Sequence, residues 1–484
     1  MTLLAAAVVC VSGPGSAETL SEPVTVSTPG STFSPVPDTA KDARTEGIRL
    51  YQKQHYAEAL PYLLDPEARK DPLVQTALGN LYSMGLGVPA DPVKALDWYR
   101  KAAVQNNAVA QLYTAYSYEK GLGTARNDRE ALNWYNKAAR QGVPNAQYKL
   151  GYLYEKGRGT AANNKQALLW YRKAAEGGIA GAQTKLGYFH YEGIDVKRDP
   201  LEAARWFYRA AEQEDVRAQT ALAHLYETGL GVGKDEARAV SWYTRAAEKG
   251  YAPAQNNLGY LYDNGLGVEQ NFSVAKKWYE AAAKQGNPSA LYNLGQLYHL
   301  GHGVPQDYAR AVDWFMQAAE KGHIKAMNNL GMAYLDGMGV EMDTGKAARY
   351  FVRAAKGGNA AAQYNLALLY VRHPVALTRA KRARTDALAM QWLSKSAQNG
   401  DPAAMTYLAD VYRYGKLGQR RNPAQANRWQ KQAASLLEKE KAERPVLPLP
   451  QNAVARQTGG VPVPAAKTAS SDTGHDKYDQ DFFQ

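Results

Sequence analysis

The chain of 484 residues repeats a motif every 36 residues, and this repetition restricts its fold more than any other feature of the sequence. Seven of its nine tryptophans follow one another at that interval, namely Trp98, Trp134, Trp170, Trp206, Trp242, Trp278 and Trp314. Tyr350 takes the next place, and the spacing then lengthens to 42 residues before Trp392 and 37 before Trp429. A motif copied this often predicts an array of repeats that pack on their neighbours, rather than one compact core.

Each repeat reads as two helices separated by glycine turns. A glycine that suits a helix C-terminal cap ends the first helix, at Gly85, Gly121, Gly157, Gly193, Gly229, Gly265, Gly301 and Gly337. A good N-cap precedes the second helix, at Asp91, Asn127, Asn163, Asp199, Asp235, Asn271, Asp307 and Asp343. Apolar residues recur at helical spacing within each helix, as at Ala167, Trp170 and Tyr171. The sequence therefore predicts an all-α solenoid, in which stacking buries a stripe that neither helix could bury alone.

About ten such repeats fill residues 71–437, and four other segments flank them. The predicted division is a signal peptide over 1–17, a Ser, Thr and Pro-rich linker over 18–44, an N-terminal capping hairpin over 45–70, the repeats, and a helix end with a disordered tail over 438–484.

The first residues resemble a secretory signal. An apolar run from Leu3 to Val11 is followed by small residues, which predicts cleavage after Ala17 and export to the periplasm or outer envelope. No Lys or Arg precedes the run, so either the true start lies upstream or the segment is not a signal. Cys10 is the single cysteine, so no disulfide can form within the chain, and Val9 disfavours a lipid anchor there. No stretch of 18 apolar residues occurs, so no transmembrane segment is expected.

Residues 146–178, with the sequence AQYKLGYLYEKGRGTAANNKQALLWYRKAAEGG, resemble the Sel1-like repeat, a relative of the tetratricopeptide repeat. The resemblance extends over residues 71–437. It implies a right-handed α-solenoid whose first helices line a concave surface, and an adaptor that assembles protein complexes, including envelope and polysaccharide-secretion complexes. Cysteine-rich members are linked to β-lactam binding, and this chain lacks those cysteines.

No constellation of catalytic or metal-binding residues is apparent. The sequence contains no zincin motif, phosphate-binding loop or dinucleotide fingerprint. His299 and His302 form an HxxH pair, but both occupy positions that vary among the repeats. We therefore expect no enzyme activity, no metal site and no cofactor.

Candidate partner-binding residues form two rows on the first helices. Tyrosines stand at Tyr116, Tyr148, Tyr152, Tyr188 and Tyr260, and asparagines at Asn257, Asn293, Asn329 and Asn365. Tyrosine and asparagine offer rigid apolar area, donors and acceptors, which suits recognition of a peptide or a glycan. The same residues could instead bond neighbouring repeats.

The ninth repeat carries a basic segment that we expect to be a loop. In place of the short glycine turn it has residues 371–386, six residues longer, with Arg372, Arg379, Lys381, Arg382 and Arg384 ahead of the first acid. The segment is either a solvated surface or a contact for an acidic partner.

Two functions are consistent with these features. The first is a protein-interaction scaffold in the bacterial cell envelope, which binds a protein or peptide in its groove and organises an export or polysaccharide-secretion complex. The alternative is a periplasmic or surface module for an anionic polysaccharide, which the net charge of +12 and pI near 9.3 would suit. A nucleic acid is not expected, because no docking motif for one occurs.

We predict that the mature chain begins near Glu18 and is found outside the cytoplasm. The reason is the apolar run followed by small residues up to Ala17. Mass spectrometry of the native protein checks this, and an intact Met1 in a cytosolic fraction would contradict it.

Overall fold

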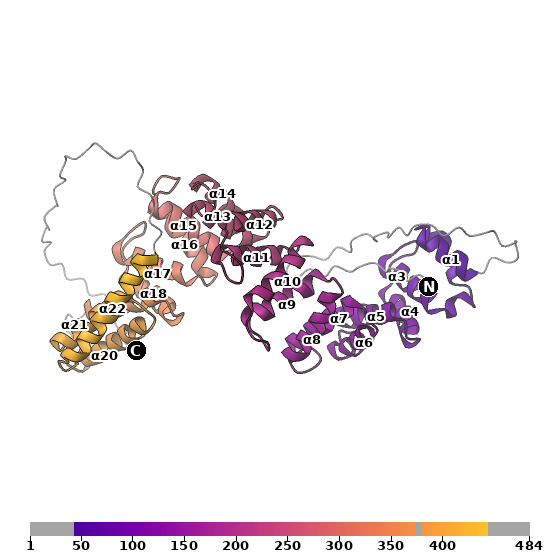
Figure 1. Cartoon of the computed structure of the whole chain (residues 1–484), viewed down its shortest axis with the longest axis horizontal. Coiled ribbons are helices and arrows are strands. Elements are labelled where there is room, and N and C mark those ends of the chain that lie inside the picture. Colours follow the sequence, from indigo (N-terminus) through magenta and orange to yellow (C-terminus); the bar gives the residue numbers. More distant parts are fainter. Residues whose placement is uncertain (1–42, 373–378, 444–484) are drawn as a thin grey trace. The chain divides into compact units, whose positions relative to one another are not determined.

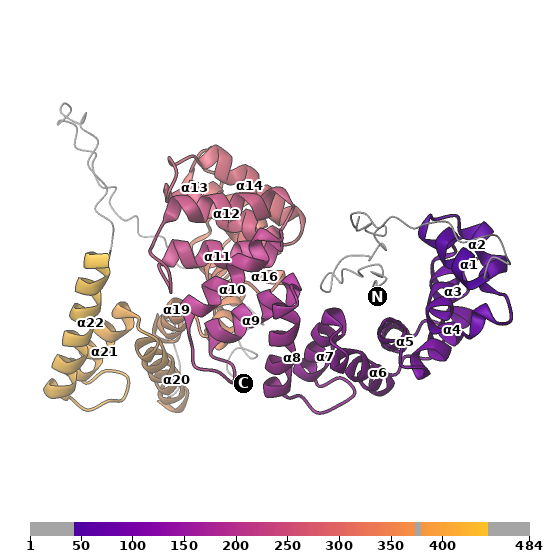
Figure 2. The same cartoon turned by 45° about the vertical axis from the view of Figure 1, so that its right-hand side comes forward.

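The computed structural model describes residues 43–372 and 379–443. Within these ranges all regular secondary structure is helical, which confirms the predicted all-α solenoid. The predicted signal peptide, Cys10 and the C-terminal tail lie outside the described residues. The helices divide into an N-terminal unit that ends at Lys249 and a C-terminal unit that begins at Gly250. In each unit consecutive helices pair as hairpins and follow one another in chain order (Figures 1 and 2).

The N-terminal unit begins with a short hairpin and continues with five repeats. Its helices are α1 (Ala43–Gln52), α2 (Tyr56–Leu63), a 3-10 turn (Ala68–Lys70), α3 (Pro72–Met84), α4 (Pro92–Val104), α5 (Ala108–Lys120), α6 (Asp128–Arg140), α7 (Pro144–Lys156), α8 (Asn164–Glu176), α9 (Ala180–Glu192), α10 (Pro200–Glu212), α11 (Val216–Thr228) and α12 (Glu236–Glu248).

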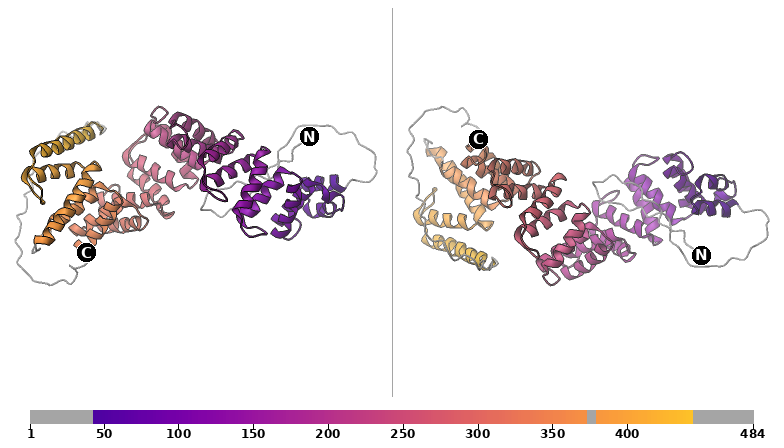
Figure 3. Two further views of the ribbon diagram at one scale, coloured as in Figure 1. Left: turned by 90° about the horizontal axis from the view of Figure 1, so that it is seen from below. Right: turned by 90° about the horizontal axis from the view of Figure 1, so that it is seen from above.

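The C-terminal unit holds the remaining hairpins (Figure 3). Its helices are α13 (Ala252–Asn264), α14 (Phe272–Lys284), α15 (Pro288–Leu300), α16 (Tyr308–Glu320), α17 (Ile324–Asp336), α18 (Thr344–Lys356), α19 (Ala360–Arg372), α20 (Arg379–Gln398), α21 (Pro402–Tyr414) and α22 (Pro423–Glu443). From α3 onward, odd-numbered helices are the first helices of the repeats and even-numbered helices are the second.

The caps that the sequence predicts are confirmed in all eight regular repeats. Each glycine after a first helix is left-handed, with φ between 65° and 76°. Each predicted Asp or Asn accepts backbone N–H bonds of the second helix, as Asp91 does from Val93 at 3.1 Å. Two repeats lack the glycine after the second helix, and there Asn106 and Glu214 take the same left-handed conformation.

An aromatic ring on the second helix closes the hairpin in each of the eight regular repeats. The residue after each regular tryptophan, and after Tyr350, is Tyr or Phe and at most 4% exposed, at Tyr99, Tyr135, Tyr171, Phe207, Tyr243, Tyr279, Phe315 and Phe351. In six repeats this ring lies against a glycine of the first helix. A Cβ atom on Gly187 would stand 2.6 Å from the Phe207 ring, and one on Gly331 would stand 2.5 Å from Phe351. The absent side chain is therefore what allows the two helices to approach.

The tryptophans pack between repeats. Trp170 belongs to the core cluster of Tyr135, and Trp206 to that of Tyr171, and in each case this partner ring lies one repeat earlier in the chain. Trp170, Trp206 and Trp242 are 8%, 8% and 9% exposed, and the other tryptophans are half-buried. The predicted packing stripe is thus present, with Tyr or Phe inside each repeat and Trp between repeats.

We predict that Trp242→Ala lowers the free energy of unfolding by about 3–5 kcal/mol, because it removes a large buried ring. Trp429→Ala should cost less, because Trp429 is half-buried on the last described helix and has packing partners on one side only. The urea midpoints of both variants check this. Equal shifts would contradict the nearest-neighbour account of stability.

Candidate functional site

The side chains of interest lie on one stripe of the first helices, which we call the first-helix row. It consists of the positions of Tyr148, Lys149 and Tyr152 and their equivalents in the other repeats. All nine predicted Tyr and Asn residues belong to this row. Tyr188 and Tyr260 are 38% and 44% exposed, and the other seven are half-buried.

On helices α13, α15, α17 and α19 the row is uncharged and rich in amides. Its members are Asn256, Asn257, Tyr260, Tyr292, Asn293, Gln296, Asn328, Asn329, Met332, Tyr364, Asn365 and Leu368. Nδ2 of Asn293 donates to Oδ1 of Asn256 at 3.0 Å, and Nδ2 of Asn365 donates to Oδ1 of Asn328 at 3.1 Å. The amides therefore do bond neighbouring repeats. Each such bond uses one of the two N–H groups of the donor, so the structural role leaves the amides with further hydrogen-bonding capacity.

In the N-terminal unit the predicted tyrosines contact other side chains. The Tyr148 ring lies 5.8 Å from that of Tyr171, and the Tyr188 ring 5.0 Å from that of Phe207. Burial raises the pKa of the Tyr148 hydroxyl, against the opposing effect of Arg217. The tyrosines here pack within and between repeats.

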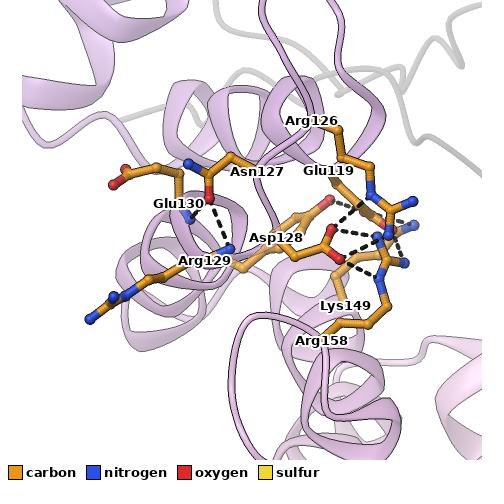
Figure 4. Close-up of polar contacts among 9 residues, drawn as sticks. Glu119, Arg126, Asn127, Asp128, Arg129, Glu130, Lys149 and Arg158 are labelled. Carbon is orange, nitrogen blue, oxygen red and sulfur yellow. Dashed lines mark hydrogen bonds and ion pairs between the residues drawn. The ribbon is translucent and has the colours of Figure 1, made fainter.

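A buried carboxylate, that of Glu119, neutralises Lys149 of the first-helix row (Figure 4). Glu119 is 6% exposed, and its Oε2 accepts from the Tyr135 hydroxyl at 2.7 Å. Lys149 Nζ lies 3.5 Å from the same oxygen, and Arg158 Nη1 lies 3.3 Å from Oε1. The charge of Lys149 is thus already paired with a carboxylate of the chain.

Asp128 extends this network on the second helix. Figure 4 shows its carboxylate between the guanidinium groups of Arg126 and Arg158. Arg158 Nη2 donates to it at 2.7 Å and Arg126 Nη2 at 2.8 Å. The bonds from Arg158 and then Arg126 hold the pKa of the Asp128 carboxyl well below its ordinary value of 3.8.

The pairing of a buried tyrosine with an acid recurs along the chain. Three further tyrosines donate to an acid of their own first helix: Tyr171 to Glu155 at 2.6 Å, Tyr243 to Glu227 at 2.8 Å and Tyr279 to Asp263 at 3.2 Å. Where the ring is Phe207, Phe315 or Phe351, the acid is replaced by Tyr191, His299 or Leu335. Sequence reasoning missed these acids, although an acid stands 16 residues before four of the five buried tyrosines, Tyr99 being the exception, and before none of the three phenylalanines.

The basic segment of the ninth repeat is not the expected loop. Helix α19 includes Arg372, and α20 already begins at Arg379, so Lys381, Arg382 and Arg384 lie in the first turns of a helix of 20 residues. The predicted conformation is therefore wrong for these residues. Arg372, Arg382 and Arg384 are exposed.

A cavity of about 500 Å³ lies beside the row in the C-terminal unit. It is lined by Pro288, Ser289, Tyr292, Asn293, Lys321, Gly322, His323, Ile324 and Lys325. The rings of Tyr292 and His323 stack with centroids 4.6 Å apart. Burial lowers the pKa of His323, and the charge of Lys325 lowers it further. Asn293 is the predicted site residue that lines this cavity, and the two lysines were not predicted.

The described ranges were also compared with the requirements of a metal site and of a membrane-spanning helix. No group of three or more His, Cys, Asp or Glu residues there could hold a metal ion. None of the helices between residues 43 and 443 that the structure describes combines the length and the apolarity needed to cross a membrane.

Comparison with known families gives a match along most of the chain. The family model for the Sel1 repeat matches residues 72–107, 108–143, 144–179, 180–215, 216–251, 252–287, 288–323, 324–359, 360–372, 386–401 and 402–436. The two short segments, 360–372 and 386–401, flank the basic segment of the ninth repeat. No curated protein sequence matches significantly.

Solved structures show the same relationship. A protective antigen of uropathogenic Escherichia coli strains, which displays an SLR fold, is 31% identical over 78% of this chain and 79% of its own, with a TM-score of 0.61. A Sel1 repeat protein from Oxalobacter formigenes is 41% identical over 50% of this chain and 97% of its own, with a TM-score of 0.47.

The Asp128 network predicts a pH dependence. Because the folded pKa of Asp128 is lowered, its contribution to stability is present above the ordinary value of 3.8 and is lost as the pH falls toward the folded value. Asp128→Asn should therefore lower the free energy of unfolding at pH 7 by about 1 kcal/mol. The difference from wild type should shrink as the pH falls from about 5 toward the folded value.

Urea midpoints across this pH range measure the effect. Asp313→Asn is the control, because Asp313 is exposed and forms no ion pair among the described residues. A difference for Asp128→Asn that stays constant with pH would contradict the assignment.

Proposed function

Because the chain belongs to the Sel1 repeat family, whose repeats generally mediate protein–protein interaction, we propose that it is a non-catalytic scaffold that binds a protein or peptide along its first-helix row. The observation that carries this proposal is the cavity at Tyr292 and Asn293, because it adjoins the row that sequence analysis selected. The binding region is the C-terminal part of the row, from Asn257 to Asn365.

The chemistry of this part of the row supports a polypeptide partner. Its amides offer donors and acceptors at the regular spacing of the first helices, and a peptide backbone offers the complementary groups. Tyr260, at 44% exposed, adds a rigid apolar surface. In the N-terminal unit, by contrast, Lys149 and Lys185 are paired with Glu119 and Glu155. The predicted residues Tyr116, Tyr148, Tyr152 and Tyr188 there are secondary contacts in this proposal.

The proposed location is the bacterial cell envelope, where the scaffold would organise an export or polysaccharide-secretion complex. The apolar run from Leu3 to Val11 supports export, as does the description of the Escherichia coli neighbour as a protective antigen. The proposed division of the chain places the signal peptide over 1–17, the linker over 18–44 and the capping hairpin over 45–70, ahead of the repeats. The tail over 438–484 follows them.

The basic segment is an auxiliary contact in this proposal. Arg382 and Arg384 are exposed on the first turns of α20, so they can reach an acidic partner from a rigid helix. An anionic polysaccharide is the second candidate ligand, and the net charge of +12 favours it.

Site-directed photo-crosslinking tests the proposal. A benzophenone amino acid placed at Tyr260 or at Met332 should crosslink to one and the same polypeptide in native extracts, because both positions belong to the row. The same label at Lys277, exposed on the second helix α14, is the matched control. Adducts of the same mass at all three positions would show non-specific capture and would reject the row as the binding site.

A further inference from the structure

The two lysines of the cavity are the strongest unexplained feature of the C-terminal unit. Lys321 follows α16, and Lys325 lies in the first turn of α17. Both are exposed, and neither forms an ion pair with a residue that the structure describes. The residues that line the cavity include no Asp or Glu.

The repeat supplies a direct comparison for Lys321. The same position two repeats earlier is Lys249, whose Nζ lies 2.9 Å from the Glu214 carboxylate at the end of the preceding repeat. The position of Glu214 is taken by Gly286 in the repeat before Lys321, and a Cβ atom on Gly286 would stand 2.9 Å from Lys321 Nζ. The lysine is therefore in the same place, and glycine, the usual residue at this position, stands where the repeat before Lys249 has an acid.

Lys325 shows the same substitution pattern. The equivalent residue three repeats earlier is Arg217, whose Nη2 lies 3.0 Å from the Asp215 carboxylate. Two residues before Lys325 stands His323, in the position of Asp215. Both cations of the cavity thus occupy positions at which another repeat carries a neutralised cation, and neither has the acid found there.

Lys321 also lacks a second tie found in other repeats. Gln285, one repeat earlier, donates to the buried Gln255 at 2.9 Å, and Gln213 donates to Gln183 at 2.8 Å. At the cavity this pair is Lys321 and Leu291, which cannot form that bond. The position has exchanged an amide link for an exposed positive charge.

We propose that this cavity binds an acidic peptide segment of the partner, with carboxylates on Lys321 and Lys325 and an adjacent apolar side chain against Tyr292, His323 and Ile324. This inference rests on the proposed function and names the chemistry of its partner. Ile324 is 37% exposed and offers an apolar wall. The volume of about 500 Å³ falls within the roughly 300–1,000 Å³ usual for ligand sites.

The distribution of charge favours a peptide over an anionic polysaccharide. A polysaccharide carries charge at regular intervals and requires cations at matching intervals. The row on either side of the cavity is uncharged, with Asn256 and Asn257 in one direction and Asn328 and Asn329 in the other. Lys321 and Lys325 lie together beside a neutral, amide-rich row. This arrangement suits an otherwise neutral peptide that carries one acidic cluster.

The test uses the full chain and two labelled peptides of matched length. The acidic probe is GSGDEFDEFGSG, and the amide probe GSGNQFNQFGSG keeps both phenylalanines and removes every charge. By fluorescence anisotropy at low salt, the wild type should bind the acidic probe about tenfold more tightly than the amide probe. Lys321→Gln combined with Lys325→Gln should abolish this difference.

The control is Lys249→Gln combined with Lys277→Gln, which removes the same net charge away from the cavity. It should bind the acidic probe within about twofold of wild type. Equal losses in the two double variants would show general charge attraction and overturn the proposal. Urea midpoints of the cavity variant should equal those of wild type, because both lysines are exposed and unpaired among the described residues.

Three further outcomes would also overturn the proposal. One is equal binding of the two probes. Another is tighter binding of polygalacturonate oligomers, which would identify an anionic polysaccharide as the occupant. The third is binding of the acidic probe only after residues 444–484 are removed, which would assign the cavity to the chain's own acidic end. Crosslinking at Tyr260 and Met332 that persists in any of these cases leaves the proposed function standing.

Discussion

Each of the eight regular repeats is closed by an aromatic ring of the second helix, which lies against a glycine or alanine of the first helix. Tyr99 on Gly79, Phe315 on Gly295 and Phe351 on Gly331 are the tightest cases, and a methyl group would overlap each ring. Interiors pack at close to crystal density, so this contact determines how near the two helices lie. The presence or absence of a hydroxyl on the ring then determines which residue of the first helix lies next to it, because a buried tyrosine hydroxyl needs an acceptor and a phenylalanine does not. The Tyr–acid pairs are therefore a consequence of the same packing.

Contacts between repeats use both apolar and polar groups. Trp206 packs into the core of the preceding repeat. Gln183 donates to the carbonyl of Ala175 at 3.1 Å and accepts from Gln213 at 2.8 Å, so one buried amide ties the end of one repeat to the next. Because these ties are made repeat by repeat, one of them can be lost without loss of the others. The substitution of Leu291 and Lys321 is such a local loss.

The sequence was most informative where the cause of structure is local. Caps such as Asp91 and turn glycines such as Gly85 act within a few residues, so a periodic pattern predicts them directly. The basic segment was misjudged because charge was weighed above helix propensity. Four cations in the first two turns oppose the helix dipole, but alanine and arginine are strong helix formers, and the segment from Arg379 joins a helix of 20 residues.

Local sequence patterns could not predict the cavity at Lys321, because what distinguishes it is the absence of an acidic partner for that lysine. Lys249 and Lys321 are the same residue at the same position, and only the partner 35 residues earlier distinguishes a neutralised lysine from an exposed charge. The recurrence of asparagine at one position of the first helices identified Asn293, since a repeated residue is visible in sequence. A lost partner becomes visible only when one intact pair, here Lys249 with Glu214, shows which positions meet. In a repeat array one repeat can thus serve as the reference for another. A lysine that lacks the acid found beside its equivalent marks a place where a ligand can supply the negative charge.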